Sequence, residues 1–248
     1  MSIDTSRVSG AANLNARDVL AAAWPLFQVS LPGCLPLAVL GVASSATPGA
    51  EAVTSGEARG LLHSGQWWGL YAASAVLMLI CYAGILRQQL AFARGSRLGV
   101  LDSLRDSLRG LPATMAVVVV YLLSAFALVP LVLFVFAWLA QLDAGLAPAQ
   151  ALRRSVELVR GRFLAVAGVI GAAIAAVLVF VLLIGIFMAV IMNLAGQGVQ
   201  PGATGLALSR WLMAAVLSLP VVYIGAVSAA AWRAASPSTP HTGENPST

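Results

Sequence analysis

Hydrophobic residues fill five long stretches of this chain in which no side chain is charged. The stretches cover residues 19–50, 60–86, 110–142, 163–209 and 211–232. An α-helix needs about 20 mainly apolar residues to cross the hydrocarbon core of a bilayer, so each stretch is long enough for at least one crossing. The pattern predicts an all-α, polytopic membrane protein.

The first uncharged stretch differs from the others because it contains Pro25, Pro32 and Pro36. Proline lacks a backbone N–H and interrupts helices, so we expect a short amphipathic surface helix at about 14–30 and a separate first span after it. In the fourth stretch a Gly-, Gln- and Pro-rich segment at 196–202 indicates a loop after one long span.

The stretch 110–142 fits neither one span nor two by length alone. A single helix over it would be roughly 50 Å long, too long for one crossing and short for two. Five Arg residues precede it and four follow it. A single crossing would place these two groups on opposite sides of the membrane, against the tendency of basic residues to stay in the cytoplasm. We therefore expect two spans with a tight turn at Pro130, while a re-entrant element stays open as the alternative.

Six spans result, at about 31–47, 67–88, 111–128, 130–143, 163–190 and 208–232. With both termini in the cytoplasm, twelve of the fourteen Arg residues lie inside and only Arg59 and Arg210 outside. We expect one membrane domain over 14–233 in a bacterial inner membrane. A disordered cytoplasmic N-terminus (1–13) and a disordered cytoplasmic tail (234–248) flank it.

Two further segments have the apolar spacing of amphipathic helices, at 98–111 and 148–163. Each precedes a predicted span, so the chain has three such surface helices. Their arginines are the candidate contacts for anionic lipid headgroups or for a protein partner. These residues are Arg105, Arg109, Arg153, Arg154, Arg160 and Arg162. A plainer interpretation is that they only fix the orientation in the membrane.

Composition narrows the possible functions. The chain is 60% hydrophobic and 9% charged, so its net charge of +5 is better explained by topology than by nucleic acid binding. Cys34 and Cys81 lie in apolar stretches, and His63 and His241 are isolated, which leaves no metal-ligand spacing. Apart from Arg87, Asp143 and Arg210 near their ends, the predicted spans also hold no Asp, Glu, Lys, Arg or His. We expect no metal, no cofactor and no enzymatic activity.

Small residues recur through 168–176, including Gly168 and Gly171. Such spacing lets helices approach closely, and we expect it to serve packing within the monomer rather than a dimer interface.

One short motif resembles a known family. Val129-Pro130, then Gln141-Leu142-Asp143, and then the run from Ala151 to Phe163 (ALRRSVELVRGRF) are similar to the hallmark region of YciC-type bacterial inner-membrane proteins. The membrane domain attached to some glycerophosphoryl diester phosphodiesterases is also similar. The resemblance implies a six-span inner-membrane protein without an assigned activity, and it supplies no catalytic residues.

The sequence therefore favours a non-enzymatic membrane protein that organises or maintains the envelope through membrane lipids or through a membrane or cytoplasmic protein partner. The alternative is a permease-like subunit that moves an apolar or zwitterionic solute, since such proteins work without buried charge and dock partners through short cytoplasmic helices.

Overall fold

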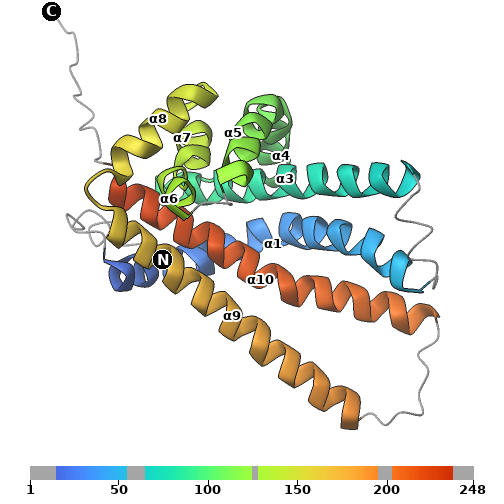
Figure 1. Ribbon diagram of the computed structural model, residues 1–248. Coiled ribbons are helices and arrows are strands. Elements are labelled where there is room, and N and C mark those ends of the chain that lie inside the picture. Colours follow the sequence, from blue (N-terminus) through green and yellow to red (C-terminus); the bar gives the residue numbers. More distant parts are fainter. Residues whose placement is uncertain (1–14, 55–64, 125–127, 195–202, 237–248) are drawn as a thin grey trace, which may run out of the picture.

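The protein is an antiparallel arrangement of long helices with a group of short helices packed on one end (Figure 1). The computed structural model describes residues 15–54, 65–124, 128–194 and 203–236. The long helices are α1 (Ala16–Thr54), α3 (Gly65–Ala93), α9 (Phe163–Leu194) and α10 (Ala203–Ala235). The short ones are α4 (Val100–Arg109), α5 (Leu111–Ser124), α6 (Leu128–Leu133), α7 (Ala137–Ala144) and α8 (Pro148–Val159).

Each long helix contains a segment that is long and apolar enough to cross a membrane. These segments are Ala16–Ser44, Trp67–Ala93, Phe163–Phe187 and Trp211–Ala235. The prediction of an all-helical protein with several membrane-span candidates is thereby confirmed for the part of the chain that the structure describes. The count of six is not: four helices qualify there, or five if the bent pair α4–α5 is taken as one span.

The expected break in the first stretch is wrong. Residues 16–54 form one helix that passes through Pro25, Pro32 and Pro36 without interruption. Neighbouring helices explain this tolerance, because α1 packs along α3 and α10, with Cys34, Leu37 and Ala38 buried between them. Proline is accepted in membrane helices when such packing compensates for the lost backbone hydrogen bond. The separate surface helix at 14–30 and span at 31–47 are thus parts of α1.

The predicted hairpin at 111–143 is present as three short helices and not as two full spans. Helix α5 has 14 residues, α6 has 6 and α7 has 8. At 1.5 Å per residue α5 is about 21 Å long, which is short of the roughly 30 Å hydrocarbon core. Pro130 lies in the first turn of α6, where a missing N–H costs little, so it is not the turn itself. Residues 125–127, which connect the two arms, lie outside the described residues.

The main hydrophobic core lies at the end of the bundle where the short helices pack. It joins the C-terminal parts of α3 and α10 to the N-terminal parts of α1 and α9, and α6, α7 and α8 close it from one side. Typical members are Leu86, Phe136, Val159, Val166 and Trp232. Figure 1 shows that the C-terminal end of α3, the N-terminal end of α9 and the C-terminal end of α10 meet there. The arginine-rich connections of the chain therefore share one end.

Helix α9 diverges from the bundle toward its C-terminal end (Figure 1). Its apolar window has a mean hydropathy of 3.1, and almost none of that window is buried. A Cβ atom added at Gly168 or Gly171 would meet no neighbour within 4 Å. The expected close packing of these glycines within the monomer is therefore wrong.

Some predictions fall outside the described residues. They concern the disordered N-terminus at 1–13, the loop at 196–202 and most of the tail at 234–248. Within the tail region, α10 continues to Ala235.

Candidate functional site

Helix α4 presents its arginines to the surroundings and its serines to the bundle. Ser103 and Ser107 are fully buried, whereas Arg105 and Arg109 are exposed. Ser107 donates a hydrogen bond to the backbone carbonyl of Ser103 (2.7 Å), so its buried hydroxyl group has a partner within α4. The small serine side chains let α4 lie close to α3. The apolar stripe predicted for this helix faces partly outward instead.

Asp102 and Arg105, and likewise Asp106 and Arg109, stand three residues apart on α4, a spacing that permits ion pairs, but neither pair forms one. The ion pairs between described residues are Arg94–Asp143, Arg153–Glu157 and Arg154–Glu157. Among the described residues, no carboxylate therefore lies within 4.0 Å of the Arg105 or Arg109 guanidinium group, and both arginines are exposed.

Helix α8, like α4, buries small side chains against the bundle and exposes its arginines. Ala151, Ser155 and Val159 are buried against α7, α5 and α6, while the side chains of Arg153 and Arg154 are 84% and 46% exposed. Glu157 contacts both arginines, at 3.2 Å from Arg153 and 3.6 Å from Arg154. Leu152 and Val156, which belong to the apolar spacing of this helix, are half-buried. One carboxylate against two guanidiniums leaves this surface positive.

Ser155 explains how α8 is held in place. Its hydroxyl donates to the carbonyl of Leu133 (2.6 Å) and accepts from the backbone N–H of Phe136 (3.1 Å). These two groups flank the break between α6 and α7, where the backbone lacks regular helical partners. A single buried hydroxyl therefore satisfies both ends of the break and joins it to the arginine-bearing helix.

Arg160 and Arg162 lie in the connection between α8 and α9, and both are exposed. Gly161 between them has φ +85°, a left-handed conformation that favours glycine. The backbone N–H of Val166 donates to the carbonyl of Arg162, so Arg162 stands at the N-terminus of α9. The partial positive charge of that helix end adds to the charge of the two arginines.

All six predicted arginines are thus exposed, but they form two separate groups. Arg153, Arg154, Arg160 and Arg162 lie on and after α8, and Arg105 and Arg109 lie on α4. Figure 1 shows α5 and α7 between α4 and α8. The sequence did not predict this separation, because it depends on how the hairpin packs.

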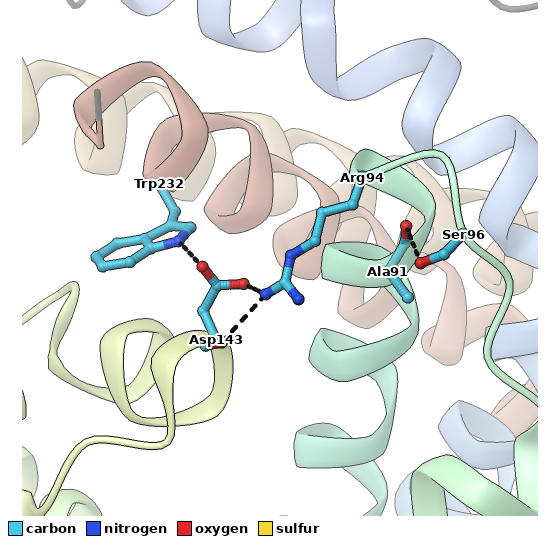
Figure 2. A network of polar contacts seen from close by, with 5 residues as sticks. All are labelled: Ala91, Arg94, Ser96, Asp143 and Trp232. Atoms are coloured by element: carbon cyan, nitrogen blue, oxygen red, sulfur yellow. Dashed lines mark hydrogen bonds and ion pairs between the residues drawn. The ribbon is translucent and has the colours of Figure 1, made fainter. Parts of the chain in front are cut away.

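Sequence reasoning also missed a polar cluster at the end of α3. The Asp143 carboxylate forms an ion pair with Arg94 and accepts a hydrogen bond from the indole N–H of Trp232 at 3.0 Å (Figure 2). Arg94 additionally donates to the backbone carbonyl of Asp143 (3.2 Å). The cluster links α3, α7 and α10. The opposite charges of Arg94 and Asp143 were visible in the sequence, but a separation of 49 residues gave no signal that they meet.

Gln88 and Gln89 were missed as well, and both are fully buried. The Gln88 amide donates to Ser103 Oγ (3.0 Å), and its Oε1 accepts from the thiol of Cys34 (3.4 Å). The Gln89 amide donates to the carbonyl of Val222 (2.8 Å). These side chains join α3 to α1, α4 and α10. Such bonds between membrane helices are worth about 0.6 to 2 kcal/mol each.

Arg87 lies beside these glutamines and is half-buried. Its side chain reaches the junction of α4 and α5, where a Cβ atom at Gly110 would stand 3.1 Å from Nη2. The Asp106 carboxylate interacts with it electrostatically. Thr114 donates to the Gln141 side chain nearby (3.2 Å). The α4–α5 bend of 73° therefore wraps around a charged side chain of α3.

An apolar cleft of about 360 Å³ lies between α3, α5, α7, α9 and α10. Valines, leucines and isoleucines form most of its wall. Tyr82, Tyr121, Trp138 and Ser228 add polar atoms. The described parts of the chain hold no group of three or more His, Cys, Asp or Glu that could bind a metal ion.

Comparison with known proteins gives no further assignment. No family model matches the chain, and neither a curated protein nor a solved structure matches it.

Proposed function

We propose that this protein is a non-enzymatic membrane protein that holds anionic lipid at its cytoplasmic face and so organises the surrounding membrane. The observation that carries the proposal is the fixed presentation of arginines at one end of the bundle. Buried serines anchor α4 and α8, and the arginines of both helices are exposed. Helix α4 also carries Asp102 and Asp106, so the excess of positive charge lies on α8 and on the connection after it. A side chain presented by an ordered helix loses less freedom on binding than one on a mobile segment.

We also propose how the chain lies in the membrane. Aromatic side chains near both ends of the bundle support a placement with four spans. Trp67, Trp68 and Tyr71 pack together near the start of α3, with centroids of the Trp67 and Trp68 rings 4.9 Å apart. Trp24, which is exposed, lies at the opposite end, near the start of α1. Tryptophan and tyrosine favour the interface between membrane and water.

The length of α3 between its aromatic residues and its contact with α4 agrees with this placement. Helix α4, with its exposed arginines, packs on α3 at Gly84 and Gln88, so the bilayer surface passes near these residues. From Trp67 to Leu86 the helix rises about 30 Å, the thickness of the hydrocarbon core. We place the hairpin of α5, α6 and α7 in the cytoplasmic half, as a re-entrant element. Both termini are then cytoplasmic, as predicted for a bacterial inner membrane.

The test of lipid binding compares the wild type with a variant in which Arg153, Arg154 and Arg160 are replaced by Gln. Each Arg near an anionic surface contributes about 1 kcal/mol, so retention of phosphatidylglycerol should weaken by up to about 3 kcal/mol, and less at high salt. Native mass spectrometry of the purified protein, titrated with phosphatidylglycerol, measures the retained lipid.

The matched control is Glu157→Gln. It removes the one carboxylate that partly neutralises Arg153 and Arg154, so retention should rise. Unchanged retention in the triple variant would leave these arginines as orientation signals only and would refute the lipid-binding role.

A permease-like subunit is the second candidate, and the apolar cleft is the observation that favours it. The lining residues on α3, α9 and α10 come from the parts of these helices nearest the arginine-bearing end. Within the described residues the cleft therefore does not extend along the whole bundle, and binding accounts for it better than passage. Co-purification of an ATPase with the protein would instead support transport.

Membership of the YciC-type family is a proposal that rests on the sequence motif.

A further inference from the structure

The apolar cleft matches one leaflet of a bilayer in length. Its wall on α9 extends from Val166 to Leu178, which is about 18 Å of helix. Half of the hydrocarbon core is about 15 Å. The volume of about 360 Å³ lies in the range of sites that enclose a small ligand. These dimensions suit one extended chain of a lipid.

The cleft is open toward the hydrocarbon of the membrane. Ile174 and Leu178 belong to its wall, yet they are 55% and 63% exposed. Val117 on α5, which also lines the cleft, is fully buried. A chain from the surrounding lipid could therefore enter sideways between α9 and the rest of the bundle, without leaving an apolar environment.

Polar groups are placed to recognise the more polar part of the same molecule. Trp138 forms part of the cleft wall, and its indole N–H is buried without an acceptor among the described residues. A buried donor that lacks a partner is costly, so an oxygen of a ligand is its natural acceptor. Arg162 stands immediately before the α9 segment that lines the cleft, and Arg233 follows Ala231, which also lines it. The cytoplasmic end of the cleft is thus positive.

We propose that the cleft binds one acyl chain of an anionic phospholipid from the cytoplasmic leaflet. An ester carbonyl of the lipid accepts from Trp138 Nε1, and the phosphate lies near Arg162 at the N-terminus of α9. This inference rests on the proposed lipid-binding function and assigns it a specific site. It differs from contact with surrounding lipid, because the chain is enclosed between helices.

The test fills the cleft and leaves the outer surface of the protein unchanged. Ala173 lies in the cleft wall, and Ala175 is exposed on the opposite side of the same helix. Ala173→Trp should lower the apparent affinity for phosphatidylglycerol by about tenfold or more, since the new ring takes the place of the chain. Ala175→Trp is the matched control and should bind as the wild type does. Native mass spectrometry of the full chain, titrated with phosphatidylglycerol, gives both affinities.

A second variant keeps the shape of the cleft and so does not depend on the folding of the first. Trp138→Phe removes the N–H and retains an aromatic ring, and it should weaken binding by about fivefold, the effect of one hydrogen bond. A phosphatidylglycerol with a photoreactive group in the middle of the acyl chain should also label Val117, which surrounding lipid does not reach. Label confined to the exposed residues of α9 would contradict an enclosed chain.

The outcomes separate this inference from the function on which it rests. If the arginine variant loses lipid while Ala173→Trp and Trp138→Phe retain it, the cleft assignment is overturned and the lipid-binding surface stands. If the wild type retains no phosphatidylglycerol, both are overturned. Preferential retention of an isoprenoid lipid would overturn the assignment of an acyl chain.

Discussion

Replacing Gly225 by alanine should loosen the contact between α3 and α10, because a Cβ atom there would overlap the Oε1 atom of Gln89. Gln89 is fully buried, and its amide is bonded to the Val222 carbonyl at 2.8 Å. The Gln89 side chain would have to turn away, and the bond would be lost. Overpacking costs typically 1–3 kcal/mol, and the lost bond adds about 0.6 kcal/mol or more. We expect the free energy of unfolding to fall by about 2–3 kcal/mol.

Unfolding in mixed micelles of dodecyl sulfate and a mild detergent, followed by circular dichroism, measures this change. The matched control is Gly171→Ala on α9, where a Cβ atom would meet no neighbour within 4 Å. The control should be neutral or stabilising by up to about 1 kcal/mol, since alanine is the better helix former.

A double variant with Gln89→Ala and Gly225→Ala tests whether the overlap with the Gln89 side chain causes the loss of stability. Shortening the glutamine removes the overlap, so the double variant should lose less stability than the sum of the two single changes. If Gly225→Ala is as stable as the wild type, or if the two losses simply add, the close contact of α3 and α10 at Gln89 is not what fixes these helices.

Two further substitutions and one labelling experiment have defined outcomes. Ser155→Ala should lower the free energy of unfolding by about 2 kcal/mol, measured as above, because both backbone groups at the α6–α7 break lose their partner; an unchanged value would contradict that role. Asp143→Ala should lower the free energy of unfolding by about 1 kcal/mol, since Arg94 is 53% exposed and water partly screens its ion pair with Asp143. A greater loss of stability at high salt than at low salt would argue against a contribution from this ion pair. The buried thiols of Cys34 and Cys81 should react with a membrane-permeable maleimide only after denaturation; rapid reaction of the folded protein would show that α1 and α3 separate.

The general class of the protein was predictable because the length of the apolar segments and the positions of the charges between them can be read from the local sequence. A run such as Phe163–Phe187 has only one stable form in a bilayer, so the sequence alone specified a long apolar helix there. The short helices α4 and α8 were predicted as well, from the spacing of apolar residues. Their arginines are exposed, but the apolar residues of α4 do not all face the bundle, since Leu101 and Leu108 are exposed as well.

The errors have a common physical origin in tertiary packing. Proline was taken as a break in α1, but contact with α3 and α10 keeps the helix continuous. The length of 110–142 was divided into two spans, whereas Arg87 from α3 occupies the junction where α4 turns into α5. Gln88 and Gln89 looked like ordinary residues at a helix end. Only their partners on other helices show that they hold the bundle together.

Cysteine accessibility tests most directly whether the arginine-bearing end faces the cytoplasm and the hairpin stays in that half. In a background with Cys34 and Cys81 replaced by Ala, single cysteines are placed at Gly65, Leu123 and Arg160, which are all exposed. An impermeant maleimide added to intact cells should label Gly65→Cys and neither of the others, and inverted vesicles should expose Arg160→Cys. Labelling of Leu123→Cys from outside would show that the hairpin crosses the membrane, and labelling of Gly65→Cys and Arg160→Cys from the same side would contradict the proposed orientation.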